Sequence, residues 1–217
     1  MFAHIKEGVD LATLAAAGAG DSSGAGAIDF VDMVGGVSYI GSGQDTTAMV
    51  NLTEGLVMAM CYVPDANGVA HALMGMTTPL VISAPTDATS SAPAPSGQDV
   101  LGTITLSDAG YEMPEDMDAG WYRVQNTDSA VHELALLRLG KPIADEQTKL
   151  VVEDLAANRT PSVAVEAVGG MGAISPGFDG YLYLDLEQGE YLVVDFMPDP
   201  GDPRPHMLDG YYTRFGV

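Results

Sequence analysis

Alternation of apolar and polar residues is clearest in the second half of the chain. Segments that combine this alternation with β-branched or aromatic residues predict strands at Val100–Leu106, Gly120–Val124 and Val131–Leu139. The apolar period then lengthens to that of a helix within Pro142–Asn158, where the proline suits a first helical turn. Two further apolar segments flank a Glu-Gln-Gly turn. They predict a hairpin from Phe178–Leu186 and Glu190–Met197, and a last strand follows in Asp209–Val217.

The first half of the chain has a similar pattern but fewer elements. Its apolar positions predict a helix at Val9–Ala17 and strands near Thr46–Leu52, Leu56–Val63 and Thr77–Ile82. Short strands with regular turns are typical of a β-sandwich. The pattern therefore predicts an all-β fold, with short helical insertions.

Two stretches of the chain are copies of one another. Val34–Asp65 and Val168–Asp199 align without a gap, so that each residue of the second copy lies 134 positions after its counterpart. Identical pairs include Gly35 with Gly169 and Gly36 with Gly170. An internal repeat determines the architecture, and this one predicts two tandem β-sandwiches.

The first repeat lacks counterparts of Val100–Val124, so we expect it to be a truncated sandwich with unpaired strand edges. The chain is then a fragment, or another chain or domain completes the first repeat, or that repeat is a reduced version packed on the second. A segment rich in Pro, Ala, Ser and Thr separates the repeats. We therefore predict a partial domain at 1–83, an extended linker at 84–99 and a full domain at 100–217.

Composition and charge exclude several classes of protein. The chain has 217 residues, of which 47% are hydrophobic, and a formal net charge of −22. Such acidity argues against binding to nucleic acid or to an anionic membrane through a basic patch. No apolar run reaches the length of a membrane span, and no signal-peptide pattern follows Met1. The linker composition is frequent in exported proteins, which favours an extracellular, periplasmic or cell-surface location.

The histidines and the single cysteine suggest metal chemistry in the first repeat. Each repeat holds two histidines, and Cys61 precedes His71 and Met76 in the first. Two imidazoles, a cysteine thiolate and a weak axial methionine form the ligand set of a blue-copper electron-transfer site. Cys61, His71 and Met76 are therefore candidate copper ligands, with His4 as the second histidine. A metal-free interpretation stays open, because buried cysteine often acts as a small apolar residue.

At this point the sequence resembles the cupredoxin family, of the plastocyanin and azurin type. The likeness rests on 108–114, Ala119-Gly120, 124–126, 132–134 and the closing segment Tyr191–Val217, with His132 in the place of the first histidine ligand. It implies a Greek-key β-sandwich with a metal site at one end. The nine residues between Cys61 and His71 depart from the family, in which two to four are usual.

The second repeat has lost the thiolate, because Asp195 stands where the first has Cys61, and Tyr211 stands at the methionine position. A blue-copper site is excluded there. His132, His206 and Asp195 are instead candidates for a colourless site that holds Cu(II), Zn(II) or another divalent ion.

The leading functional hypothesis is a secreted or cell-surface cupredoxin-like protein that passes electrons through copper to a redox partner protein. The alternative is a metal-free structural or interaction module that has kept the fold and lost the site. We do not expect an enzyme, because no acid–base apparatus accompanies the histidines.

Overall fold

The protein is a two-layered β-structure with helices on one side. The structure, a computed structural model, describes residues 1–19, 25–84, 95 and 99–217. Eight strands form the larger sheet, in the order β15 (Tyr212–Gly216), β12 (Glu190–Val194), β9 (His132–Leu139), β10 (Val165–Ile174), β2 (Val31–Gly35), β1 (Phe2–Ile5), β4 (Gly55–Met60) and β5 (Thr77–Ile82). Five form the smaller sheet, in the order β3 (Thr47–Val50), β11 (Asp179–Leu184), β8 (Gly120–Asn126), β6 (Val100–Ser107) and β7 (Gly110–Glu112).

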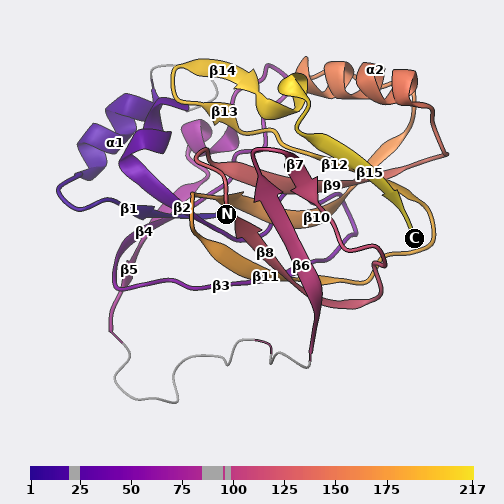
Figure 1. Cartoon of the computed structure of the whole chain (residues 1–217). Helices are drawn as coiled ribbons and strands as arrows, with labels where there is room; N and C mark the ends of the chain where they lie inside the picture. The colour runs from indigo at the N-terminus through magenta and orange to yellow at the C-terminus, as the bar shows by residue number, and fades with distance from the viewer. Residues whose placement is uncertain (20–24, 85–94, 96–98) are drawn as a thin grey trace.

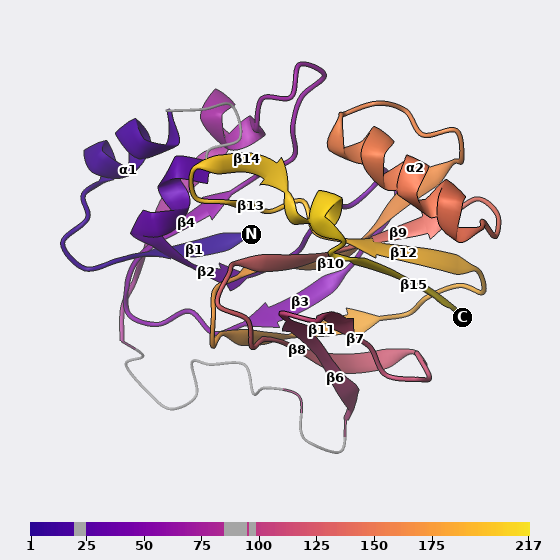
Figure 2. The same ribbon diagram turned by 45° about the horizontal axis from the view of Figure 1, so that its top comes forward.

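Figures 1 and 2 show the two layers and the helices above them. The helices α1 (Leu11–Gly18) and α2 (Asp145–Ala156) lie on the face of the larger sheet that points away from the smaller one. The remaining elements are the short ribbon of β13 (Pro198–Asp199) with β14 (Asp202–Pro205), and the 3₁₀ turns η1 (Ala25–Phe30), η2 (His71–Met74) and η3 (His206–Asp209). The prediction of an all-β sandwich with short helical insertions is confirmed.

Apolar side chains from both sheets meet in the space between them. Tyr122 and Leu182 of the smaller sheet and Leu134 and Tyr191 of the larger sheet are almost completely buried in one cluster. Full burial of such side chains contributes about 1.5–3 kcal/mol each. This cluster holds the two sheets together.

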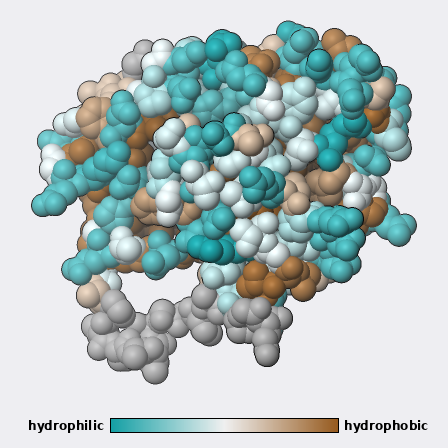
Figure 3. All heavy atoms as spheres, viewed as in Figure 1, coloured by the Kyte–Doolittle hydropathy of each residue, from teal (hydrophilic) through white to brown (hydrophobic). Residues whose placement is uncertain are grey.

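Each helix covers a separate apolar area of the larger sheet. Val151 and Val152 of α2 pack against Leu137 and Leu192, while Leu14 of α1 packs against the cluster beneath it. Hydrophilic residues cover most of the surface in Figure 3, with separate hydrophobic areas. In the described part of the chain, no helix has the length and apolar character needed to cross a bilayer.

The predicted hairpin of Phe178–Leu186 with Glu190–Met197 is wrong. The strands β11 and β12 form at these places but belong to different sheets, where β11 pairs with β8 and β3, and β12 with β9 and β15. The short segment between them crosses from one sheet to the other. Leu182 and Tyr191 therefore face the same core from opposite sides, and two apolar strands around a glycine turn match either arrangement.

Residues from both sides of the predicted linker share both sheets. Ile174 of β10 pairs with Val34 of β2 in the larger sheet, and β11 pairs with β3 in the smaller one. The segment 84–99 falls almost entirely outside the described residues. The division into domains at 1–83 and 100–217 stays a prediction.

The strand registers of the two halves agree. Phe2 pairs with Gly35 and Ala59 in the first half, and Leu136, Gly169 and Val193, each 134 positions later, pair in the same way. By this register His4 corresponds to Arg138 and not to His132, which was assigned the place of the first histidine ligand.

The contact between the halves has the geometry of a local two-fold axis. Val37 forms an antiparallel β-bridge with Met171, and Met171 is the residue that corresponds to Val37 in the second half. On either side, Ser38 N donates to Gly170 O (3.1 Å) and Gly172 N donates to Gly36 O (2.8 Å). Exchanging the halves converts each of these hydrogen bonds into the other, as in an interface between two like subunits.

Candidate metal centre

Three buried side chains converge at one end of the sandwich. Asp195 Oδ2 lies 2.6 Å from His132 Nδ1 and 3.0 Å from His206 Nδ1. His132 begins β9, Asp195 directly follows β12, and His206 begins η3. Because β9 and β12 are antiparallel neighbours, the start of one and the end of the other meet at the same edge. The structure thus brings together all three residues predicted for the second repeat.

Backbone hydrogen bonds hold Asp195 in one orientation. Its Oδ1 accepts from Met197 N (2.8 Å) and Glu133 N (3.4 Å), which leaves Oδ2 facing the histidines. The Asp195 carbonyl accepts from Met207 N (3.0 Å) and so fixes η3 beneath the carboxylate. Asp195 is 0% exposed, so these contacts replace its lost hydration.

The His132 ring is held on its other side as well. Its Nε2 lies 3.1 Å from Asp128 Oδ2, and its face stacks on Tyr211 with a centroid distance of 4.0 Å and an interplanar angle of 8°. The Tyr211 hydroxyl donates to Ser107 O (2.9 Å), which fixes the tyrosine ring. Tyr211, at the position expected for a methionine ligand, therefore covers the site without offering a sulfur atom.

The His206 ring has a second carboxylate near its outer nitrogen. His206 Nε2 lies 3.3 Å from Asp199 Oδ1, although no partner among the described residues meets the geometry of a hydrogen bond. Burial lowers the pKa of His206, but the carboxylates of Asp195 and Asp199 outweigh it, and the net direction is upward. The surroundings therefore favour positive charge on this ring.

Both rings thus have both nitrogens close to carboxylate oxygen. A neutral imidazole carries one N–H and one lone pair, so one nitrogen of each ring would point a lone pair at an anion. A proton on each ring, or one cation bound between the two Nδ1 atoms and Oδ2, removes this repulsion. Two imidazole nitrogens and one carboxylate oxygen suit Cu(II) and Zn(II), and the residues present fit such an ion.

A further buried acid lies directly behind the centre. Burial, together with the negative charge of Asp195, raises the pKa of Glu133 to about 8, even though Phe196 N and Ser38 Oγ donate to its carboxyl group. Roles for Glu133 and Asp128 and the stacking by Tyr211 were not predicted from the sequence. Asp128 lies four residues before His132 in a turn, but only the fold shows that its carboxylate reaches the ring.

The structure brings two of the four candidates in the first half together. Cys61 Sγ lies 3.7 Å from His71 Nδ1, and both residues are half-buried. The Met76 carbonyl accepts from Cys61 N (3.1 Å), but the Met76 side chain is 59% exposed. The first half therefore offers one sulfur and one nitrogen side by side.

His4 lies apart from this pair. Its Nε2 is 3.1 Å from the carbonyl oxygen of Glu54, just before β4, whereas Cys61 follows the other end of that strand. Seven residues of extended chain span about 23 Å. Among the described residues, the one cluster of three ligating side chains is that of His132, Asp195 and His206.

The chain was compared with known proteins. No family model and no curated protein sequence matches it. Among solved structures, it is similar to auracyanin B, with 19% identity and a TM-score of 0.33 over 58% of this chain and 99% of that one. It is also similar to a dithionite-reduced auracyanin from the photosynthetic bacterium Roseiflexus castenholzii, with 16% identity and a TM-score of 0.33 over 54% of this chain and 94% of that one.

Proposed function

We propose that this chain is a cupredoxin-like metal-binding protein whose centre consists of His132, Asp195 and His206, and that its ion is Cu(II) or Zn(II). One observation carries the proposal: Asp195 Oδ2 lies 2.6 and 3.0 Å from two imidazole nitrogens whose rings already face other carboxylates. An imidazole nitrogen binds a metal ion only through its lone pair, so the ion and protons compete for the two Nδ1 atoms. Binding of the ion should therefore tighten as pH rises and release protons.

The residues of the chain have separate parts in this function. The two Nδ1 atoms and Oδ2 would bind the ion, and Asp128 would orient His132 through its Nε2–H. Tyr211 covers one side of the His132 ring and limits access of water. Copper in such a set would supply one-electron chemistry, while zinc would supply a structural link between β9, β12 and η3.

Metal titration of the purified, EDTA-treated protein tests this proposal. We expect calorimetry with Zn(II) and with Cu(II) to give one site per chain, and Cu(II) to give an electron paramagnetic resonance spectrum with coupling to two nitrogens. Asp195→Asn should weaken binding by at least about 100-fold, since loss of an outer-shell partner alone costs 10–100-fold. Asp209→Asn, an exposed change in the same 3₁₀ turn, is the matched control.

Equal affinity in the wild type and Asp195→Asn would contradict the assignment. If Asp195→Asn does not fold, His206→Gln provides the same test from the other side of the ion. A folded protein that binds neither metal would favour the alternative of a metal-free structural or interaction module.

A second candidate function, copper-dependent electron transfer, rests on the Cys61 Sγ to His71 Nδ1 distance of 3.7 Å. A thiolate and an imidazole at this spacing suit a soft ion such as Cu(I), with Met76 or His4 requiring movement to join them. An intense visible absorption on addition of Cu(II), lost in Cys61→Ser, would support this function. Its absence would exclude a thiolate–Cu(II) site.

We also infer that the two halves arose by duplication, and that a chain or domain completes the first half. The shared registers and the paired hydrogen bonds about Val37 and Met171 support the duplication. In the described chain, β3 is an edge strand, whereas its counterpart β11 has β8 on that side. The proposed setting is extracellular, periplasmic or cell-surface, with a redox partner instead of a substrate to transform.

A further inference from the structure

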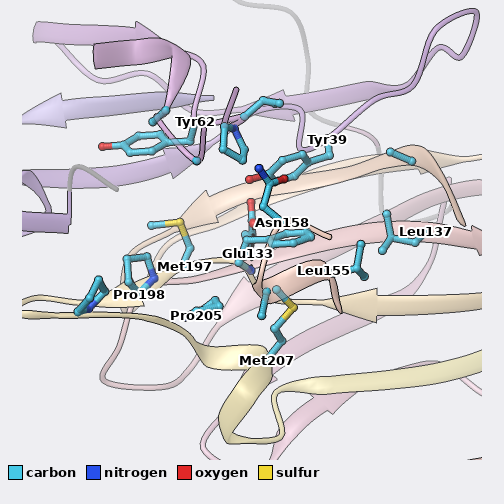
Figure 4. A pocket seen from close by; sticks show the side chains of 18 of the residues that line it. Tyr39, Tyr62, Glu133, Leu137, Leu155, Asn158, Met197, Pro198, Pro205 and Met207 are labelled. Atoms are coloured by element: carbon cyan, nitrogen blue, oxygen red, sulfur yellow. Dashed lines mark hydrogen bonds between the residues drawn. The ribbon is translucent and has the colours of Figure 1, made fainter. Parts of the chain in front are cut away.

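A cavity of about 420 Å³ lies between the two halves, on the helix-bearing side of the larger sheet. Figure 4 shows Tyr39 and Tyr62 of the first half on one side of it, and Met197, Pro205 and Met207 of the second half on another. Leu155 and Asn158, from α2 and the turn after it, close a third side. Ligand pockets are commonly 300–1,000 Å³, so the space suits a compact molecule built around one ring.

The walls of the cavity are mainly apolar and aromatic, and Glu133 is the carboxyl group among them. Figure 4 places its side chain in the middle of the lining. Glu133 is 1% exposed and is held by Phe196 N (3.2 Å) and Ser38 Oγ (3.4 Å). Backbone and hydroxyl donors fix its direction but supply no positive charge.

No lysine or arginine is among the described residues that line the cavity. The α-amino group of Met1 donates to Met60 O and is not part of this lining. Within this apolar lining the Glu133 carboxyl group has hydrogen-bond donors but no basic side chain beside it. A cationic ligand would supply the missing partner.

We propose that this cavity binds a small organic cation, an amine with a compact apolar body whose ammonium group pairs with Glu133. The apolar body would lie against Leu155 and Met207.

The charge and the aromatic lining of the chain favour a cation over an anion or a neutral molecule. Tyr39 and Phe196, whose ring centroids lie 4.6 Å apart, both line the cavity, and aromatic rings attract an ammonium group. The net charge of −22 raises the local concentration of cations and opposes anions.

The site depends on contact between the halves. Asn158 Nδ2 donates to Asp65 O (3.1 Å) and so joins the turn after α2 to the first half at the edge of the cavity. A bound amine would contact both halves at once, and its binding energy would add to the stability of their contact.

Phenethylamine, 2-phenylethanol and phenylacetate are suitable probes because they share a ring and differ in charge. We would titrate each into the EDTA-treated full chain, labelled at the methionine methyl groups, and follow the resonances of Met197 and Met207. Met113, which packs in the core between the sheets, is the internal reference. We expect phenethylamine to shift Met197 and Met207 and to bind at least tenfold more tightly than either of the other two compounds.

Glu133→Gln should weaken phenethylamine binding at least tenfold, whereas Glu187→Gln, which changes an exposed acid paired with Arg138, should leave it unchanged. If Glu133→Gln does not fold, Leu155→Trp fills the cavity and should abolish the shifts. The proposal fails if the alcohol binds as tightly as the amine, if no amine shifts these methyl groups, or if the folded variants bind like the wild type.

Discussion

Around the two candidate sites, the halves of the molecule share backbone hydrogen bonds but present different side chains. His71 N donates to Val63 O and Ala72 N to Cys61 O, as His206 N donates to Met197 O and Met207 N to Asp195 O. Both 3₁₀ turns end at a glycine with φ near +100°, at 97° for Gly75 and 99° for Gly210. The loops around the two candidate sites thus have the same conformation, although the ligating side chains that they carry differ.

The difference lies in what these loops present. The second half offers Asp195 with two histidines in a closed, buried set, whereas the first offers Cys61 with one histidine in a half-buried pair. Phe2 of β1 matches Leu136 of β9, so His4 lies at the position of Arg138 and not at that of His132. The comparison teaches that the exchange of Asp195 for Cys61 and a histidine at another register position separate two chemically distinct sites.

Removing the acid from the second-half site should have the largest effect on stability. Asp195→Ala leaves two buried histidines and the N–H of Met197 without their partner, and loss of one member of a buried pair costs about 3–5 kcal/mol. Cys61→Ala, the matched change in the first half, should cost about 1 kcal/mol. Urea unfolding of the metal-free variants measures both. Similar losses of stability in Asp195→Ala and Cys61→Ala would contradict the proposed difference between the two sites.

Stability should also depend on pH through Glu133, the buried acid beside the second-half centre. Burial raises its pKa in the folded protein from 4.5 to about 8. Below pH 4.5 both states are protonated; between 4.5 and 8 the unfolded chain loses this proton first, so stability falls as pH rises. The loss of stability is at most about 1.4 kcal/mol for each unit by which the pKa is raised on folding. Unfolding at pH 5 and pH 8.5 should show this decline in the wild type and a smaller one in Glu133→Gln.

Matched glycine substitutions in the two halves should differ in their loss of stability by a smaller amount. A methyl group on Gly170 would overlap the carbonyl oxygen of Leu134, whereas one on Gly36 would approach Met1 Cα to 3.0 Å and the Phe2 ring to 3.1 Å. Gly170→Ala should therefore cost about 3 kcal/mol and Gly36→Ala about 1 kcal/mol less. Gly177→Ala, where positive φ is combined with open space, measures the backbone contribution alone. Equal losses at Gly170 and Gly36 would show that φ, and not the contact, dominates.

Local pattern was sufficient for most elements of the fold. The strands at Val100–Ser107 and His132–Leu139 and the helix at Asp145–Ala156 follow from alternation and helical period. The crossing between β11 and β12 could not be predicted, because a hairpin and a change of sheet have the same local pattern. Which one forms depends on core packing around Leu182 and Tyr191.

The candidate site divides in the same way. The alignment of Asp195 with Cys61 identified the second-half ligand set from the sequence. The placement of His4 could not be derived from the sequence. The aligned repeat begins at Val34, so it does not give the register of β1, which precedes β2. Asp128 and Glu133 are ordinary acids in sequence, and only the approach of other elements gives one a histidine partner and deprives the other of water.

The larger sheet that runs through both halves has a consequence for how the molecule denatures. Its central contact, between β2 and β10, is made of backbone hydrogen bonds on both sides of Val37 and Met171. If one half unfolded, β2 or β10 of the other half would lose its partner and become an exposed sheet edge, which is an aggregation hazard. Neither half can unfold without exposing such an edge on the other, so each depends for its solubility on the integrity of the other.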